Sequence, residues 1–247
     1  RIDVRAHDRG GPRGPGRVHV DRYSRTQELG GRQYDLEEGL APEHDAIREY
    51  FDGPGRPARV KLSYAVQAVA DGTARAVLAG QAFVGDDPFL VLNADNLYPT
   101  KVLQTLVALD GPGLPAFERE ALAQESGFPA DRVAGFALLE VDASGALGGI
   151  IEKPSAAQLA AAGPHALVSM NLWRFDHRIF AACAEVPRSA RGEFELPEAV
   201  AIAVTTGTTF RVFRASGAVL DLSRQADIPI VAADAIAGEN RDAEGFH

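Results

Sequence analysis

One group of candidate catalytic residues lies at the end of an apolar run. Residues 88–94, PFLVLNA, form a continuous apolar stretch that leads into Asn93, Asp95 and Asn96. Such a run is typical of a central strand that is covered on both faces. In open α/β sheets, ligands collect beyond the carboxyl ends of strands. A carboxylate there can hold a divalent cation against phosphate oxygens, although Asp95 and Asn96 could equally cap a turn.

A second candidate binding segment contains Gln67, Gly72 and Thr73. We expect a helix to begin at Gly72 and Thr73, and the first turn of a helix offers free N–H groups and a positive dipole end. Gly72 lets a planar base or a phosphate approach the backbone, and the amide of Gln67 can both donate to and accept from a base edge. The same pattern also fits a glycine that only makes a turn.

Two later strand ends also carry charged side chains. Glu152, Lys153 and Pro154 follow an apolar stretch, and Lys153 is one of three lysines in the chain. Its ammonium could bind a phosphate and Glu152 could accept from sugar hydroxyls, or the two could form a surface ion pair. Asp221 ends another apolar stretch, as Asp95 does. The two aspartates could share one Mg²⁺ if they meet in space.

Alternating strand and helix patterns must position these residues. The periodicities predict strands over 59–64, 88–94, 134–142, 146–153, 166–175, 209–215 and 218–222, and helices over 71–83, 100–109, 154–162, 176–186, 195–204 and 224–237. Thr100 and Asp176 are expected to cap their helices, and Pro154 is expected just inside its helix. The alternation predicts an α/β protein, a three-layer α/β/α sandwich with a mostly parallel, Rossmann-like sheet.

Composition limits the function classes. The chain has 247 residues, is 46% apolar and carries a net charge of −9, which argues against nucleic acid as the main partner. Its single cysteine, Cys183, excludes a disulfide scaffold and a cysteine-based zinc site, and we expect it in the core. No apolar run is long enough to cross a membrane, and residues 1–11 lack a secretory pattern. We therefore expect a cytoplasmic protein with no membrane partner.

Charge is unevenly distributed along the chain. Residues 1–33 carry eight arginines and four acidic residues, a net charge of +4, and follow neither a helical nor a strand period. We expect an atypical basic segment over 1–40, interpreted most simply as a disordered tail, then one domain over 41–237 and a C-terminal tail over 238–247.

In this order, the motifs resemble the sugar-1-phosphate nucleotidylyltransferases, the nucleotidyltransferase family that makes nucleotide sugars. The resemblance covers about residues 41–237 and implies a GT-A-like nucleotide-diphospho-sugar transferase fold. It rests on five segments: SYAVQAVADGTARAVLAGQAFVGDDPFLVLNADN, GFALLEVDASGALGGIIEKP, VSMNLWRFDHRIF, RGEFELPEAV and GAVLDLSRQADI. By this likeness the chain would transfer a nucleotidyl group from a nucleoside triphosphate to a sugar-1-phosphate, with Mg²⁺ as cofactor, and release pyrophosphate.

The resemblance also implies a role for each matching residue. Gln67, Gly72 and Thr73 would bind the nucleotide, and Gly135, Glu152 and Asn171 would bind the sugar. Lys153 would bind the sugar phosphate, and Asp95 and Asp221 would bind Mg²⁺. The catalytic residues would be Asp95, Lys153 and Asp221. The base, the sugar and the oligomeric state are left open by these motifs.

The chain departs from the family pattern at its start. The family opens with a strand and a Gly-rich loop, roughly L-A-A-G-x-G-T-R, whereas residues 9–17, RGGPRGPGR, contain two prolines without an N–H and follow no apolar strand. Residues 1–39 could be a diverged phosphate loop or the product of a shifted reading frame. After Asp221, Leu-Ser-Arg stands where the family often has Gly-Thr. The alternatives are a catalytically impaired nucleotide-sugar-binding or regulatory module and a GT-A glycosyltransferase, which would transfer sugar without releasing pyrophosphate.

Overall fold

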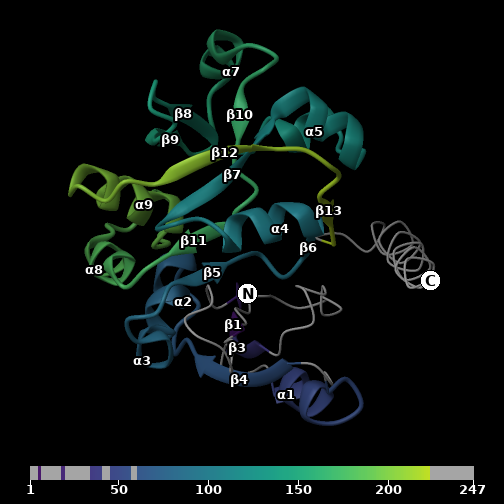
Figure 1. Cartoon of the computed structure of the whole chain (residues 1–247), viewed down its shortest axis with the longest axis vertical. Helices are drawn as coiled ribbons and strands as arrows, with labels where there is room; N and C mark the ends of the chain where they lie inside the picture. Colours follow the sequence, from purple (N-terminus) through teal and green to yellow (C-terminus); the bar gives the residue numbers. More distant parts are fainter. Residues whose placement is uncertain (1–4, 7–17, 20–33, 41–44, 57–59, 223–247) are drawn as a thin grey trace.

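A mixed sheet forms the centre of the molecule (Figure 1). The computed structural model describes residues 5–6, 18–19, 34–40, 45–56 and 60–222. Strands of the main sheet follow the order β5-β11-β7-β10-β8-β9, and β12 pairs with β7. Their bounds are Phe89–Val91 for β5, Gly113–Glu118 for β7, Leu138–Val141 for β8, Leu147–Ile151 for β9, Leu167–Val168 for β10, Trp173–Phe175 for β11 and Arg211–Ala215 for β12.

The sheet is less parallel than its sequence suggested. Among the described strands, only β12 with β7 and β3 (Tyr34–Leu40) with β4 (Val60–Val66) run parallel. The remaining pairs, β8 with β9 among them, are antiparallel. The expectation of a mostly parallel sheet is therefore wrong in this respect. A short turn can join β8 to β9 only as a hairpin, because a parallel pair needs a long crossover.

Helices cover both faces of the sheet, as the three-layer prediction requires. Their bounds are Asp45–Asp52 (α1), Thr73–Ala79 (α2), Gln81–Val84 (α3), Thr100–Val107 (α4), Arg119–Ser126 (α5), Ala130–Val133 (α6), Ala156–Ala162 (α7), Arg178–Glu185 (α8) and Leu196–Thr205 (α9). One core cluster joins α4, α5 and α6 to one face, and a second joins α2, α3, α8 and α9 to the other. Leu90 belongs to the first cluster and its neighbours Phe89 and Val91 to the second, as the period of two in a strand demands. Within the described ranges, no helix is both long and apolar enough to span a membrane.

Helix starts differ in detail from the sequence prediction. Ser155 caps α7, with its hydroxyl accepting from the backbone N–H of Gln158, so Pro154 lies before the cap rather than inside the helix. Thr100 is the first residue of α4, after Pro99 in the capping position. Asp176 precedes the capping residue of α8, although its carboxylate accepts the N–H of Arg178 at 3.0 Å.

Cys183 is fully buried on α8, as expected, and burial raises the pKa of its thiol to about 12.

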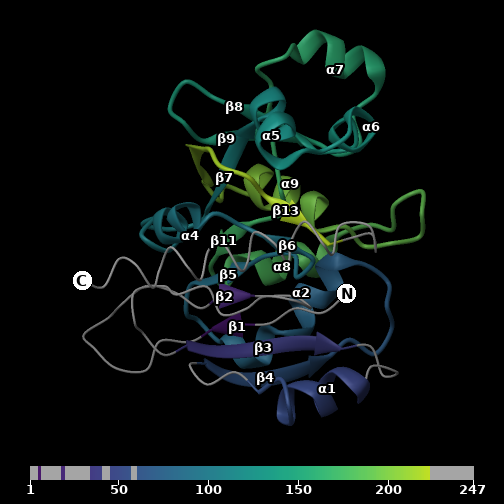
Figure 2. The ribbon, with the colours of Figure 1, turned by 90° about the vertical axis from the view of Figure 1, so that its right-hand side faces the viewer.

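Two strands lie within residues 1–33, the basic segment whose sequence follows neither a helical nor a strand period, and β3 begins directly after it. β1 (Arg5–Ala6) pairs with β2 (Val18–His19), and both lie between β3 and β5 in the view of Figure 2.

The expected helix over 224–237 and the tail over 238–247 lie outside the described residues, as do residues 9–17. β6 (Asn96–Leu97) pairs with β13 (Leu220–Asp221), which brings Asp221 close to Asp95, the residue just before β6.

Candidate active site

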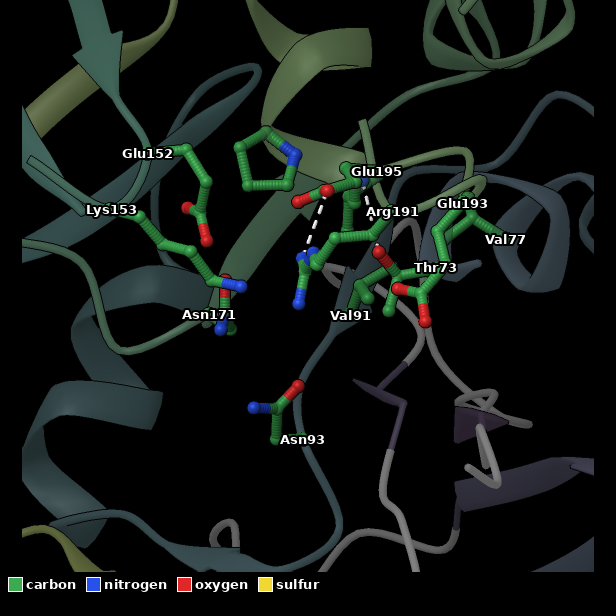
Figure 3. Close-up of a pocket in the computed structure, with 12 residues that line it drawn as sticks. Thr73, Val77, Val91, Asn93, Glu152, Lys153, Asn171, Arg191, Glu193 and Glu195 are labelled. Carbon is green, nitrogen blue, oxygen red and sulfur yellow. Dashed lines mark hydrogen bonds and ion pairs between the residues drawn. The ribbon is translucent and has the colours of Figure 1, made fainter. Parts of the chain in front are cut away.

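A pocket of about 140 Å³ opens where three strands end (Figure 3). Its walls come from the ends of β5 and β9, the loop between β10 and β11, the start of α2 and the loop that leads into α9. Its apolar lining comes from Val77, Val91, Leu196 and Pro197, and seven charged or amide side chains and Thr73 line the remainder. This combination of an apolar wall with convergent polar groups is typical of a small-molecule site.

Four of the residues predicted from the sequence meet in this pocket. Thr73, Glu152, Lys153 and Asn171 all line it, from segments that are far apart in the chain. Lys153 and Asn171 have positive φ angles, 46° and 54°, and they are the only described non-glycine residues that do. Strained backbone of this kind clusters at functional sites, because the surrounding structure must hold it in place. The backbone geometry therefore marks the same place as the charged residues.

Three further charged residues in the pocket were missed as site residues. Arg191, Glu193 and Glu195 lie on the loop before α9 and line the pocket opposite Lys153 (Figure 3). Arg191 Nη2 lies 2.8 Å from Glu195 Oε1. Burial alone would raise the pKa of Glu195, but hydrogen bonds from Arg191 and Ser189 and the charges of Arg191 and Lys153 hold it below its usual value. Glu195 therefore stays ionised and keeps Arg191 oriented within the pocket.

The signal for these three residues was present in the sequence. They lie in the segment RGEFELPEAV, which carried part of the family resemblance. Only the position of the loop in space shows that their side chains face Lys153.

Gln67 and Gly72 contact protein in this structure. The Gln67 side chain donates to Asp71 Oδ1 at 3.2 Å and to the carbonyl of Gly72 at 3.1 Å. Gly72 has φ 127°, and a Cβ at this position would lie 2.3 Å from the carbonyl oxygen of Phe194. The glycine is therefore required here by a close approach of two backbones. Thr73 Oγ1 likewise accepts the N–H of Leu196 at 2.9 Å, at the start of α9.

Asp95 and Asp221 come together at the β6–β13 pair, outside the set of residues that line the pocket. Asp221 lies opposite Asn96, and the carbonyl of Asp95 accepts the N–H of Leu222 at 2.6 Å. Among the described residues, no group of three or more His, Cys, Asp and Glu side chains could hold a metal. One or two carboxylates with substrate phosphates suffice for Mg²⁺, so the donor chemistry of this pair fits that ion.

Asp221 is already engaged by a cation. Arg132 forms an ion pair with its carboxylate, and the two side chains are only 13% and 10% exposed. The guanidinium of Arg132 also lies 5.1 Å from the centroid of the Phe128 ring. A metal ion on Asp221 would have to share this carboxylate with Arg132.

Tyr98 links the aspartate pair to the pocket. Its buried hydroxyl donates to the carbonyl of Met170 at 2.6 Å and accepts from the backbone N–H of Asn93 at 3.4 Å. Burial raises the pKa of Tyr98 above its usual value, and the charges of Asp95 and Asp221 act in the same direction. Tyr98 thus holds together the loop with Asn93 and the loop with Asn171, next to both aspartates.

Gly135 is not among the residues that line the pocket. It is exposed after α6, and its N–H donates to the carbonyl of Arg132 at 3.0 Å. The structure thus brings Thr73, Glu152, Lys153 and Asn171 into one site and leaves Gln67, Gly72 and Gly135 outside its walls.

The family model described as nucleotidyl transferase matches residues 41–222. The chain belongs to the nucleotidyl transferase family. That match confirms the resemblance drawn from the five sequence segments.

Curated relatives of this family member include sugar-phosphate nucleotidyltransferases. The chain is 27% identical over 155 residues to the glucose-1-phosphate thymidylyltransferase of Mycolicibacterium smegmatis, covering 63% of this chain and 49% of that one. It is 26% identical over 183 residues to the UTP–glucose-1-phosphate uridylyltransferase AglF of Haloferax volcanii, covering 74% and 70%. The bifunctional protein GlmU of Methanococcus maripaludis is 27% identical over 166 residues, covering 67% and 34%. The chain thus spans about a third to a half of the length of several relatives it matches.

Solved structures confirm the α/β fold. A UDP-glucose pyrophosphorylase in complex with UDP-glucose superposes with a TM-score of 0.62 at 18% identity, covering 81% of this chain and 79% of that one. A Bacillus anthracis protein described as a putative glucose-1-phosphate thymidylyltransferase gives a TM-score of 0.57 at 21% identity, covering 79% and 73%.

Proposed function

We propose that this chain transfers a nucleotidyl group from a nucleoside triphosphate to a sugar-1-phosphate. The sugar phosphate oxygen attacks the α-phosphorus, the bond between the α-phosphorus and its bridging oxygen to the β-phosphate breaks, and pyrophosphate leaves. The observation that carries the proposal is the convergence of Glu152, Lys153, Asn171 and Arg191 in one pocket at the strand ends. Membership of the nucleotidyl transferase family supports the same reaction class.

Charge and hydrogen-bonding capacity assign the roles within the pocket. Lys153 and Arg191 are the two cations of its wall, and both can bind the phosphate of the sugar-1-phosphate. Glu152 can accept from sugar hydroxyls, and Asn171 can both accept from and donate to them. Gly135, which lies outside the pocket walls, is the third proposed sugar contact. Thr73, which lines the pocket, forms the proposed nucleotide segment with Gln67 and Gly72. The protein contributes alignment and charge neutralisation, with no covalent intermediate.

Asp95 and Asp221 are the proposed ligands of Mg²⁺. When bound, the ion would neutralise charge on the phosphate oxygens of the nucleotide. Their proximity at the β6–β13 pair, where the carbonyl of Asp95 accepts the N–H of Leu222, and their oxygen donors support this assignment.

The test is pyrophosphate release across a grid of nucleoside triphosphates and hexose-1-phosphates with Mg²⁺. Lys153→Ala and Asp95→Asn should each lower the rate by about 10²–10³, which is typical for the loss of one preorganised charged group. Lys101→Ala and Asp131→Asn are matched controls, because both parent side chains are exposed and lie outside the pocket. Both controls should keep the wild-type rate.

Three outcomes would contradict the proposal. No release across the grid, from a folded protein that still binds a nucleotide sugar, would make the chain a binding or regulatory module. Sugar transfer to an acceptor without pyrophosphate would make it a glycosyltransferase. Equal loss of activity in the control variants would mean that the pocket has no special part in the reaction.

A further inference from the structure

The loop before α9 is fastened to the start of α2 by backbone hydrogen bonds. Phe194 donates its N–H to the carbonyl of Asp71 at 2.7 Å and accepts the N–H of Ala74 at 2.9 Å. Between these two contacts, the Cα of Gly72 faces the Phe194 backbone with no room for a side chain. Phe194 is therefore held from both sides by one short segment that lies about 120 residues earlier in the chain.

The ring of Phe194 is held independently of its backbone. The guanidinium carbon of Arg75 lies 4.3 Å from the ring centroid, and that of Arg188 lies 4.6 Å from it. Arg75 belongs to α2 and Arg188 to the loop itself, so the ring joins the two. Arg188 also lies 3.8 Å from Asp71 and donates to the carbonyl of Gly192 at 2.6 Å.

This fastening determines where the charged pocket residues stand. Glu193 and Glu195 are the chain neighbours of Phe194, and both line the pocket. Ser189 donates its N–H to the carbonyl of Glu193 at 2.8 Å, which closes the turn that carries Arg191. If Phe194 lost its hold on α2, the turn would lose its fixed position, and the Arg191 guanidinium would lose its place opposite Lys153.

We propose that Phe194 is a positioning residue that holds Arg191 and Glu195 in the pocket by clamping the loop 188–195 to the start of α2. The proposal rests on the proposed function, because it assigns Arg191 to the sugar phosphate. Phe194 does not line the pocket and would act only through its neighbours. The clamp also ties the proposed nucleotide segment at Gly72 and Thr73 to the proposed sugar-phosphate site.

The experiment compares three variants with the wild-type chain by two readouts. Phe194→Leu keeps an apolar side chain but removes both contacts with arginine, and Phe194→Tyr keeps the ring. Arg75→Gln removes one contact from outside the loop, and it tests the clamp even if Phe194→Leu does not fold. The first readout is limited trypsin cleavage after Arg188 and Arg191, whose side chains are 58% and 46% exposed. The second is the KM for the sugar-1-phosphate and, separately, for the nucleotide.

Loss of two cation–π contacts should raise the population of the open form of the loop about fivefold to thirtyfold. Phe194→Leu should therefore be cleaved at these two bonds faster by that factor, since cleavage follows the open population when reclosing is fast. Its KM for the sugar-1-phosphate should rise by a similar factor, with kcat changed less than about threefold. Arg75→Gln should show about half of the effect on a logarithmic scale, and Phe194→Tyr should match the wild type.

A purely structural role would lower thermal stability without separating KM from kcat. Unchanged cleavage in Phe194→Leu would overturn the clamp. Faster cleavage with an unchanged KM for the sugar-1-phosphate would overturn the positioning role. If the wild-type chain releases no pyrophosphate, the proposed function is wrong, and the cleavage comparison alone then decides whether Phe194 orders the loop.

Discussion

Replacing Gly72 with alanine tests the most demanding backbone contact beside the pocket. Gly72 has φ 127° and ψ 166°, a region that is essentially reserved for glycine. The added Cβ would lie 2.3 Å from the carbonyl oxygen and 2.5 Å from the nitrogen of Phe194. Backbone atoms cannot move aside as the end of a flexible side chain can, so the two segments must separate.

Two costs add up in this variant. Holding a non-glycine residue in this region costs about 1–3 kcal/mol. Separation would also break the hydrogen bonds of Phe194 with Asp71 and Ala74, each worth about 0.5–1.5 kcal/mol. We therefore expect Gly72→Ala to lower the free energy of unfolding by about 2–6 kcal/mol.

Gly127→Ala is the matched control, because Gly127 also has a positive φ of 67° but no atom lies within 4 Å of the position that an alanine methyl would take. It should cost about 1–2 kcal/mol, the penalty of the left-handed conformation alone. The assay is urea denaturation followed by the fluorescence of Trp173, the only tryptophan, which is fully buried beside Val91. If Gly72→Ala were no more destabilising than Gly127→Ala, the close approach of the two backbones would be refuted.

Three further outcomes are expected. Tyr98→Phe leaves the carbonyl of Met170 without its 2.6 Å donor and should cost about 1–3 kcal/mol in the same urea assay, with no change expected in secondary structure by circular dichroism. The pKa of Glu195 is depressed in the folded protein, so its pairing with Arg191 stabilises the folded protein at pH values above the ordinary carboxyl pKa. This stabilisation is lost as the pH falls through the pKa that Glu195 has in the folded protein. The wild-type chain should accordingly be more stable than Glu195→Gln at about pH 7, and the difference should shrink as the pH falls below the ordinary carboxyl pKa in parallel urea titrations. Lys153→Gly should be about 0.5–1 kcal/mol more stable than Lys153→Ala, because glycine adopts a positive φ without strain. Both variants should lose pyrophosphate release. Equal stabilities would contradict backbone strain at Lys153.

Local signals predicted much of the fold. The apolar run at 88–94 became β5, and the stretches around Asp142 became the β8–β9 hairpin. The Asp142 carboxylate accepts the N–H of Ser144 at 2.8 Å and of Ala146 at 3.0 Å, a turn that its sequence already indicates. Such elements need only their own residues to be recognised.

The central strand β7 could not be predicted in this way. Its sequence, GLPAFE, has a proline in the middle, and proline normally argues against a central strand. β7 is central because β10, β11 and β12 all pair with it. Gly113 is needed there since its Cβ would lie 2.4 Å from the carbonyl oxygen of Arg211, about 100 residues later. Long-range pairing of this kind leaves no local pattern.

The same distinction separates the predicted site residues from the missed ones. Glu152 and Lys153 follow an apolar strand, and the ends of strands are where ligands are expected. Asn171 came from the family resemblance, and it lies in the loop that divides the strand predicted over 166–175 into β10 and β11. Arg191, Glu193 and Glu195 lie on a loop whose position depends on Phe194 and the start of α2. Sequence reasoning found the residues that the sheet positions and overlooked those that a loop contact positions.

Backbone strain separates a functional interpretation of Lys153 from a structural one. Asn171 tolerates a positive φ, and its N–H donates to Ser169 Oγ at 3.2 Å, so a turn alone could explain it. Lysine has no such tolerance, and the buried Pro154 that follows it restricts its backbone further. A chain that needed only a turn here would be more stable with glycine. The exposed lysine at this position, opposite Arg191 at the edge of the pocket, fits the proposed role of its ammonium group in binding phosphate.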